Sequence, residues 1–202
     1  DGIIRHTAVI PFGGNVITND IKEGCSILEK QAEQLKIKFG SALSTQNKDN
    51  EIVSIPGLRG RDPKEISLKN LASIIQARME EIIELVVHEI KNSGYHNKLI
   101  GGIVLTGGGS QLKHLSQLVE YHCGIQCRVG YPNEHLASTS PIDVSSPMYA
   151  TGVGLVIKAL EDNKLTEKSK QDSIQRKSSS GLGDFFGGLL DKIDDFLGND
   201  IK

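Results

Sequence analysis

The sequence has little of several features that define common protein classes. Only three of its 202 residues are cysteines and only 4% are aromatic. Cys25, Cys123 and Cys127 form an odd set without a Cys-x-x-Cys pair, which argues against a disulfide scaffold and a cysteine zinc site. We therefore expect reduced thiols in a cytoplasmic protein. No apolar run approaches the ~20 residues that span a bilayer, which excludes a transmembrane helix.

The chain also lacks a large excess of charge of either sign, since its net charge is −2. No basic cluster stands out, so binding of nucleic acid through phosphate neutralisation is disfavoured. The six histidines include no His-Glu-x-x-His pattern and no close pair, and the chain has no Gly-x-Ser-x-Gly elbow. These absences predict neither a metal site nor a serine hydrolase.

Strand and helix signals alternate along residues 1–160 and predict an α/β fold. The longest helical pattern covers 67–92. A second helix is expected to begin after Ser26 as its N-cap, with Glu29 completing a capping box, and to end at Gly40. Strands are expected at 3–10, 51–55, 100–106 and 125–129. Helices are expected at 15–24, 26–39, 67–92, 110–121 and 148–160. The apolar stripe of the longest helix comprises Leu71, Ile74, Ile75, Met79, Ile82, Ile83, Val86 and Ile90.

The sharpest motif is a glycine loop between a strand and a helix, Gly107-Gly108-Gly109-Ser110. Glycines let the backbone approach a ligand closely, and a following helix favours an anion at its N-terminus. The loop is neither a P-loop nor a dinucleotide fingerprint, because no Gly-Lys-Ser/Thr follows and Gly-x-Gly-x-x-Gly is absent. A tight connection without ligand remains the alternative.

Four stretches together resemble the C-terminal half of the FtsA family of bacterial cell-division proteins, within the actin-like ATPase superfamily. The likeness covers about residues 1–160. In chain order the stretches are Thr7–Asp20, Ala32–Lys36 with Gly40–Ala42, Leu105–Leu112, and Pro147–Leu155. The fold that this resemblance implies is the C-terminal half of an actin-like (ribonuclease H-like) fold in two subdomains, followed by a disordered linker and an amphipathic helix.

The resemblance implies ATP as ligand. Nucleotide-binding positions would be Gly13, Gly14, Glu33, Lys36, Gly107, Gly108, Gly109 and Ser110. Glu33 and Lys36 lie three residues apart on a helix, so both can face one ligand, although an ordinary exposed ion pair is the alternative. The superfamily's phosphate loops, with the residues that hold Mg²⁺, would precede Asp1. We therefore expect this chain alone to bind ATP poorly, and at most slow ATP hydrolysis in the full-length protein.

The family also implies a division into subdomains. Residues 1–20 plus 99–160 would form the sheet subdomain, and 21–98 the outer insertion that docks the C-terminal peptide of FtsZ. Basic residues of 59–79 would suit that acidic peptide, although a solvated helix face is the alternative. They are Arg59, Arg61, Lys64, Lys69 and Arg78.

The last 42 residues differ in composition from the rest of the chain. Residues 161–180 offer few large apolar side chains, which predicts a disordered linker. Residues 181–198 have helical apolar spacing with four aspartates outside the apolar arc. The apolar set is Leu182, Phe185, Phe186, Leu189, Leu190, Ile193, Phe196 and Leu197. The membrane interface, a partner groove and the protein's own domain are the possible docking surfaces, and the resemblance favours the membrane.

The implied function is that of a cell-division adaptor. Such a protein binds ATP, polymerises as actin does, and tethers FtsZ filaments to the cytoplasmic face of the cell membrane at the division septum. The alternative is another actin-superfamily ATPase, such as an MreB-like filament protein, a chaperone or a sugar kinase. A chaperone would continue into a substrate domain, whereas this chain continues into a polar linker and one amphipathic segment.

Overall fold

A computed structural model describes residues 3–48, 50–57, 62–134 and 144–162. The chain divides into two compact units, Asp1–Thr151 and Gly152–Lys202. The amphipathic segment 181–198 and nearly all of the expected linker lie outside the described residues. The subdomain division expected from the sequence stays a prediction.

The first two helices are α1 (Gly14–Cys25) and α2 (Glu29–Phe39), which pack on each other. The helix expected at 15–24 is confirmed, whereas the capping box expected at Ser26 and Glu29 is wrong. Ser26 has a left-handed backbone (φ 48°, ψ 54°), and its N–H donates to carbonyls in the last turn of α1. α2 begins later, after Leu28, whose N–H donates to the side chain of Gln31 (3.1 Å). Ser26 therefore ends one helix and does not begin the next.

A β-hairpin comes next, formed by β1 (Ile52–Ile55) and β2 (Lys64–Ser67), which pair antiparallel. β1 was expected, but β2 was not, because four residues with one buried apolar position carry little strand signal. Ile55 and Ile66 are buried and fix the hairpin to the core.

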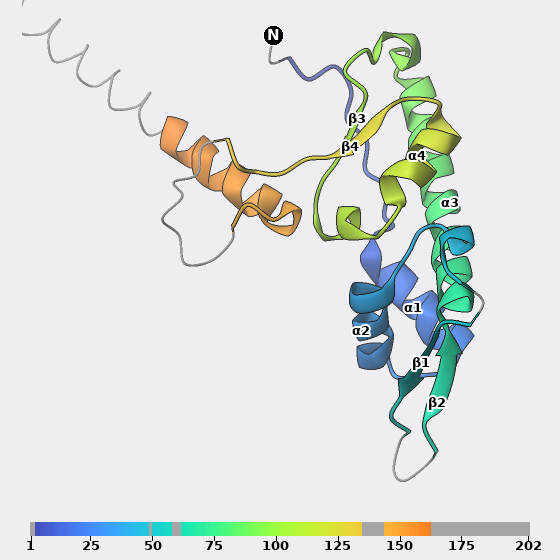
Figure 1. The fold of residues 1–202 in the computed structure, drawn as a ribbon. Helices are drawn as coiled ribbons and strands as arrows, with labels where there is room; N and C mark the ends of the chain where they lie inside the picture. Colours follow the sequence, from blue (N-terminus) through green and yellow to red (C-terminus); the bar gives the residue numbers. More distant parts are fainter. Residues whose placement is uncertain (1–2, 49, 58–61, 135–143, 163–202) are drawn as a thin grey trace, which may run out of the picture. The chain divides into compact units, whose positions relative to one another are not determined.

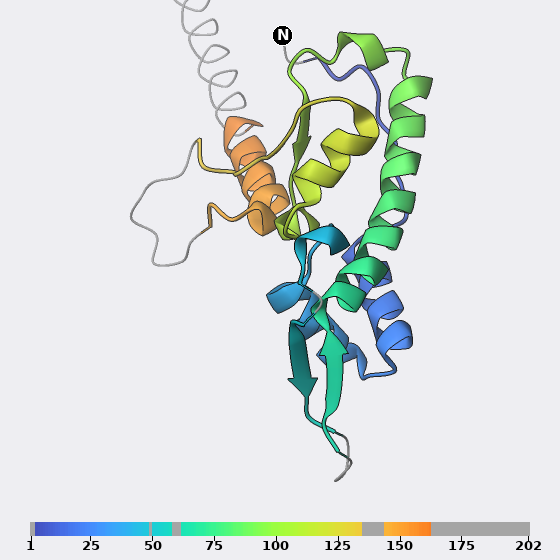
Figure 2. The same cartoon turned by 45° about the vertical axis from the view of Figure 1, so that its right-hand side comes forward.

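The long helix α3 (Leu68–Asn92) follows the hairpin directly, as expected, and Ser67 caps its N-terminus. The side chains of Leu71, Ile75, Met79 and Ile83 are buried, which confirms the predicted stripe as far as Ile83, whereas Val86 and Ile90 are only half-buried. In both views α3, drawn in green, runs from the hairpin past α1 to α4 (Figure 1, Figure 2). One helix thus carries the core shared by the first helices and the second sheet.

The second sheet consists of β3 (Ile103–Leu105) and β4 (Cys127–Val129), which pair in parallel. They are joined by α4 (Leu115–Cys123), which packs on both α3 and β4. Short 3₁₀ turns lie at Ser44–Gln46, His96–Lys98, Gly108–Gln111 and Pro147–Tyr149, and residues 150–162 are helical.

The strand expected at 3–10 is wrong, because these residues have no regular structure and are almost all exposed. A strand needs a hydrogen-bonded neighbour, and β3 is paired only with β4 among the described residues. Ile3, Ile4 and Val9 therefore remain largely exposed. None of the helices described is long and apolar enough to cross a membrane.

Candidate functional site

The glycine loop leaves β3 through a backbone turn that only its first glycine requires. Gly107 has φ +86°, a conformation that side chains rarely adopt. Its N–H donates to the carbonyl of Pro147 (3.0 Å), so the segment before the last described helix contacts the loop. A 3₁₀ turn then covers Gly108–Gln111.

The helix expected from Ser110 begins only at Leu115. His114 precedes it with a left-handed backbone (φ 61°), which interrupts the helical path. Gly108 and Gly109 thus lie within a 3₁₀ turn, and an irregular segment follows that turn before the helix begins. The argument for an anion at the N-terminus of the next helix does not apply to them.

The second and third glycines have no conformational or packing requirement within the chain. A Cβ atom at Gly108 or Gly109 would meet nothing within 4 Å, and neither has a positive φ. The same holds for Gly13, whose backbone is extended. These three glycines line one cavity of about 600 Å³. Side chains at these positions would reduce its volume.

The cavity is mostly apolar, with one carboxylate and two ammonium groups in its lining. Its size falls within the ~300–1,000 Å³ typical of small-molecule sites. It is lined by Phe12, Gly13, Gly14, Ile17, Glu33, Lys36, Ile37, Gly40, Met79, Ile82, Gly108, Gly109, Gln111, Leu112, Lys113, Leu115 and Met148. α1, α2, α3 and the glycine loop all contribute to it.

One wall carries a hydrogen-bonded cluster centred on Lys36. Its Nζ lies 2.9 Å from the carbonyl oxygen of Gly14, 2.8 Å from Thr18 Oγ1 and 2.7 Å from Glu33 Oε2. Thr18 Oγ1 also lies 2.5 Å from Glu33 Oε2. The Lys36 side chain is 12% exposed, whereas that of Glu33 is 41% exposed. The lysine is therefore buried beneath the carboxylate.

The cluster favours the ionised form of Glu33. Burial opposes ionisation, but the hydrogen bonds from Lys36 and Thr18 and the lysine charge outweigh it, so the pKa of Glu33 is lowered. An ionised carboxylate offers only acceptors, which suits hydroxyl donors of a ligand.

Gly40 and the next two residues hold the α2 wall against the glycine-loop wall. Ser41 forms a parallel bridge with Lys113, and the N–H of Ala42 donates to the carbonyl of Lys113 (2.8 Å). A Cβ atom at Gly40 would lie 2.3 Å from the carbonyl oxygen of Lys36 and 2.8 Å from Leu112 Cδ2. The close approach of the two walls depends on this glycine.

A family model for the cell division protein FtsA matches residues 1–154. The chain belongs to the FtsA family. It is 37% identical to FtsA of Pseudomonas aeruginosa, over 80% of this chain and 38% of that protein. It is 32% identical to FtsA of Neisseria meningitidis, over 98% of this chain and 46% of that protein. It is also 32% identical to FtsA of Escherichia coli K12, over 90% of this chain and 44% of that protein. The chain thus spans less than half the length of these FtsA relatives.

Solved structures agree on the fold. MreB5 of Spiroplasma citri bound to ADP aligns with a TM-score of 0.56 at 19% identity, over 76% of this chain and 46% of that one. The same protein bound to AMPPNP aligns with a TM-score of 0.54. This FtsA-family chain therefore has part of an actin-like fold, as the sequence resemblance implied.

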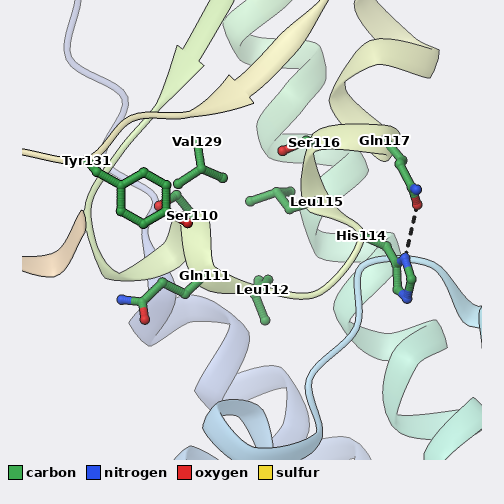
Figure 3. Close-up of a pocket in the computed structure, with 9 residues that line it drawn as sticks. All are labelled: Ser110, Gln111, Leu112, His114, Leu115, Ser116, Gln117, Val129 and Tyr131. Carbon is green, nitrogen blue, oxygen red and sulfur yellow. Dashed lines mark hydrogen bonds between the residues drawn. The ribbon is translucent and has the colours of Figure 1, made fainter. Parts of the chain in front are cut away.

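Most of the predicted site residues of this FtsA-family chain share the cavity, but two do not. Gly13, Gly14, Glu33, Lys36, Gly108 and Gly109 line it, whereas Gly107 does not. Ser110 lines a separate cavity of about 340 Å³ beside Val129 and Tyr131 (Figure 3). Its buried hydroxyl donates to the carbonyl of Gly107 (2.8 Å). Ser110 therefore stabilises the turn of the glycine loop by a hydrogen bond within it.

The basic residues expected to meet an acidic peptide differ in their environments. Lys64 is exposed on β2, and Lys69 is exposed on α3. Arg78 donates to Asp20 of α1 and to Glu81, which makes it a link between helices. Arg59 and Arg61 lie outside the described residues.

Sequence reasoning missed Thr18 and the apolar wall from α3. Thr18 follows Gly14 by four residues, so the helical period alone places the two on one face. Met79 and Ile82 were predicted as core of α3, and no local signal brings them to the glycine loop. Among the described residues no group of three His, Cys, Asp or Glu side chains is placed to hold a metal ion.

Proposed function

We propose that this chain supplies the adenosine side of a nucleotide cleft in an FtsA-family cell-division protein. The observation that carries the proposal is the trio Gly13, Gly108 and Gly109. They line a cavity of ligand size, although neither packing nor backbone conformation in this chain requires glycine there. The apolar lining suits a purine ring, and the Glu33 carboxylate suits the ribose hydroxyls.

The phosphates of ATP and the accompanying Mg²⁺ would be held elsewhere in the longer protein. The FtsA relatives are more than twice as long as the stretch they share with this chain. The likeness to MreB5, solved with ADP and with AMPPNP, supports an adenine nucleotide as the ligand. Bound Mg²⁺ would neutralise phosphate charge, and we assign it no ligand among the described residues.

The first test is a titration of the ¹⁵N-labelled 202-residue chain with ATP, followed by NMR. We expect weak, millimolar binding with amide shifts concentrated at Gly108, Gly109 and Lys36. Gly109→Ala should remove those shifts and leave the free energy of unfolding within about 0.5 kcal/mol of wild type, because its methyl group meets only open space.

Gly101→Ala is the matched control, since a Cβ atom there also meets nothing and the residue lies outside the cavity lining. It should retain the shifts of the wild type. Shifts spread over surfaces away from the cavity, or a Gly109→Ala variant that binds as the wild type does, would contradict the proposal. Micromolar affinity would contradict the expected division of the cleft.

We further propose that the protein acts as an adaptor at the division septum, where it binds the C-terminal peptide of FtsZ, forms filaments and attaches to the membrane. Its membership in a family of cell-division proteins supports this role. The FtsZ peptide is acidic on the family resemblance, and the exposed Lys64 on the β1–β2 hairpin could pair with it. The amphipathic segment 181–198 would supply the attachment to the cytoplasmic membrane face.

A further inference from the structure

Thr18 is not among the nucleotide-binding positions that the family resemblance implies, yet it lies at the centre of the polar wall of the cavity. It is 4% exposed, and its hydroxyl approaches groups from both α1 and α2. A hydroxyl has one proton to donate. Two acceptors are within reach, the carbonyl oxygen of Gly14 at 3.0 Å and Glu33 Oε2 at 2.5 Å. The charged and nearer carboxylate is the stronger acceptor.

Lys36 uses all of its protons within the protein. An ammonium group has three donors, and Nζ lies within hydrogen-bond distance of three oxygens, on Gly14, Thr18 and Glu33. A ligand contact would require one of these bonds to break. The expectation that this lysine donates to the nucleoside therefore conflicts with its geometry.

Glu33 differs in that its two oxygens have different environments. Oε2 accepts from both Thr18 and Lys36, whereas Oε1 has no partner among the described residues. The side chain is 41% exposed and lines the cavity. One oxygen is thus fixed and the other is available to a ligand.

We infer that Thr18 is a positioning residue for the nucleoside. With Lys36 it holds Oε2 of Glu33, so that Oε1 accepts from a hydroxyl of the bound ligand, while Lys36 makes no ligand contact of its own. The inference rests on the proposed function for the identity of the ligand. The arrangement within the protein can be tested without any ligand.

The ligand-free arm of the experiment is an NMR titration of the Glu33 carboxyl carbon in the 202-residue chain. Thr18→Val keeps the shape of the side chain but removes the hydroxyl, so the pKa of Glu33 should rise towards its ordinary value. Thr18→Ser should titrate as the wild type does. Ser73→Ala is the control, because it also removes a helix hydroxyl that lies 3.0 Å from the carbonyl oxygen four residues earlier, but Ser73 is outside the cavity lining.

The ligand arm compares ADP with 2′-deoxy-ADP and 3′-deoxy-ADP on the same variants. The wild type, Thr18→Ser and Ser73→Ala should bind at least one deoxy analogue about tenfold more weakly than ADP, as expected for one lost hydrogen bond to a charged group. Thr18→Val should lose most of this preference. A packing role for Thr18 would change the affinity for all three nucleotides alike.

The outcomes separate the two claims. An unchanged Glu33 titration in Thr18→Val overturns the positioning role, whatever the nucleotide does. Absence of nucleotide binding to the wild type overturns the proposed function, and the titration still decides the role of Thr18. If the valine variant does not fold, loss of the ribose preference in Thr18→Ser overturns the inference.

Discussion

Gly40 illustrates a glycine that is needed for space and not for conformation. Its φ of −59° is open to every residue, and it ends α2 as the sequence predicted. What excludes a side chain is the carbonyl oxygen of Lys36 and the methyl group of Leu112. The helix end and the glycine loop touch through this residue.

Gly40→Ala should therefore destabilise the protein by about 2–3 kcal/mol, because a methyl group forced against backbone has no flexible neighbour to displace. Urea unfolding followed by circular dichroism measures the change. Gly101→Ala, which meets open space, should stay close to wild type. Equal stabilities of the two variants would contradict the steric cost, because the lower entropy of the unfolded chain favours folding in any Gly→Ala variant.

At the residue scale, the sequence predicted several residues that share one cavity, but not the contacts among them. Gly13, Glu33, Lys36 and Gly108 do come together in one cavity. Thr18 was not predicted, because a threonine among apolar helix positions reads as ordinary core. Its role depends on the distance between two helices, which no local pattern contains.

Among the elements, the junction between α1 and α2 shows how a cap can be misassigned. Ser26 followed by Glu29 has the sequence of a capping box. The structure instead continues α1 to Cys25 and uses Ser26 as a left-handed residue that reverses the chain. Both readings predict a serine at a helix boundary, but they predict opposite responses to substitution.

Ser26→Gly should raise the free energy of unfolding by up to about 1 kcal/mol, because glycine adopts the left-handed conformation without strain. Ser26→Ala should be nearly neutral. An N-cap serine would behave differently, with alanine costing about 1 kcal/mol and glycine only a few tenths. Ser67→Ala at the true N-cap of α3 is the control and should show that cost in thermal or urea unfolding.

Periodicity predicted the type of most elements, and each wrong or missed prediction has a physical cause. The predicted apolar stripe of α3, from Leu71 to Ile90, extends over about five and a half turns, so no local signal competes with it. Residues 3–10 carry β-branched side chains, but no strand of the described part of the chain pairs with them. β2 has four residues and is too short to show a period. At the glycine loop, the left-handed His114 delays α4 by five residues.

For the whole molecule, a net charge near zero conceals three segments that differ in charge and in phenylalanine content. Residues 1–160 have no net charge, 161–180 carry +1, and 181–202 carry −3. Three of the five phenylalanines lie in the last segment. We propose that the cavity and the membrane attachment are separate parts of one adaptor, joined by a polar linker.

Phe185→Asp with Phe186→Asp should release the protein from liposomes, because charge replaces two of the eight apolar side chains that would enter the interface. Co-sedimentation with vesicles of neutral and anionic lipid measures the bound fraction. Phe185→Leu with Phe186→Leu is the control and should remain bound. If the aspartate variant still sediments, the segment has another docking surface, such as a protein groove.

The bridge between Ser41 and Lys113 gives the cavity a measurable opening equilibrium. The amide of Ala42 is fully buried and bonded to the carbonyl of Lys113 across the two walls. That proton can exchange with solvent only when the walls part, so its protection factor reports the free energy of separation. A ligand that contacts both walls, and so binds only the closed state, would slow this exchange by the factor 1 + L/Kd, where L is the free ligand concentration. A single amide thus records how often the cleft is open and what holds it closed.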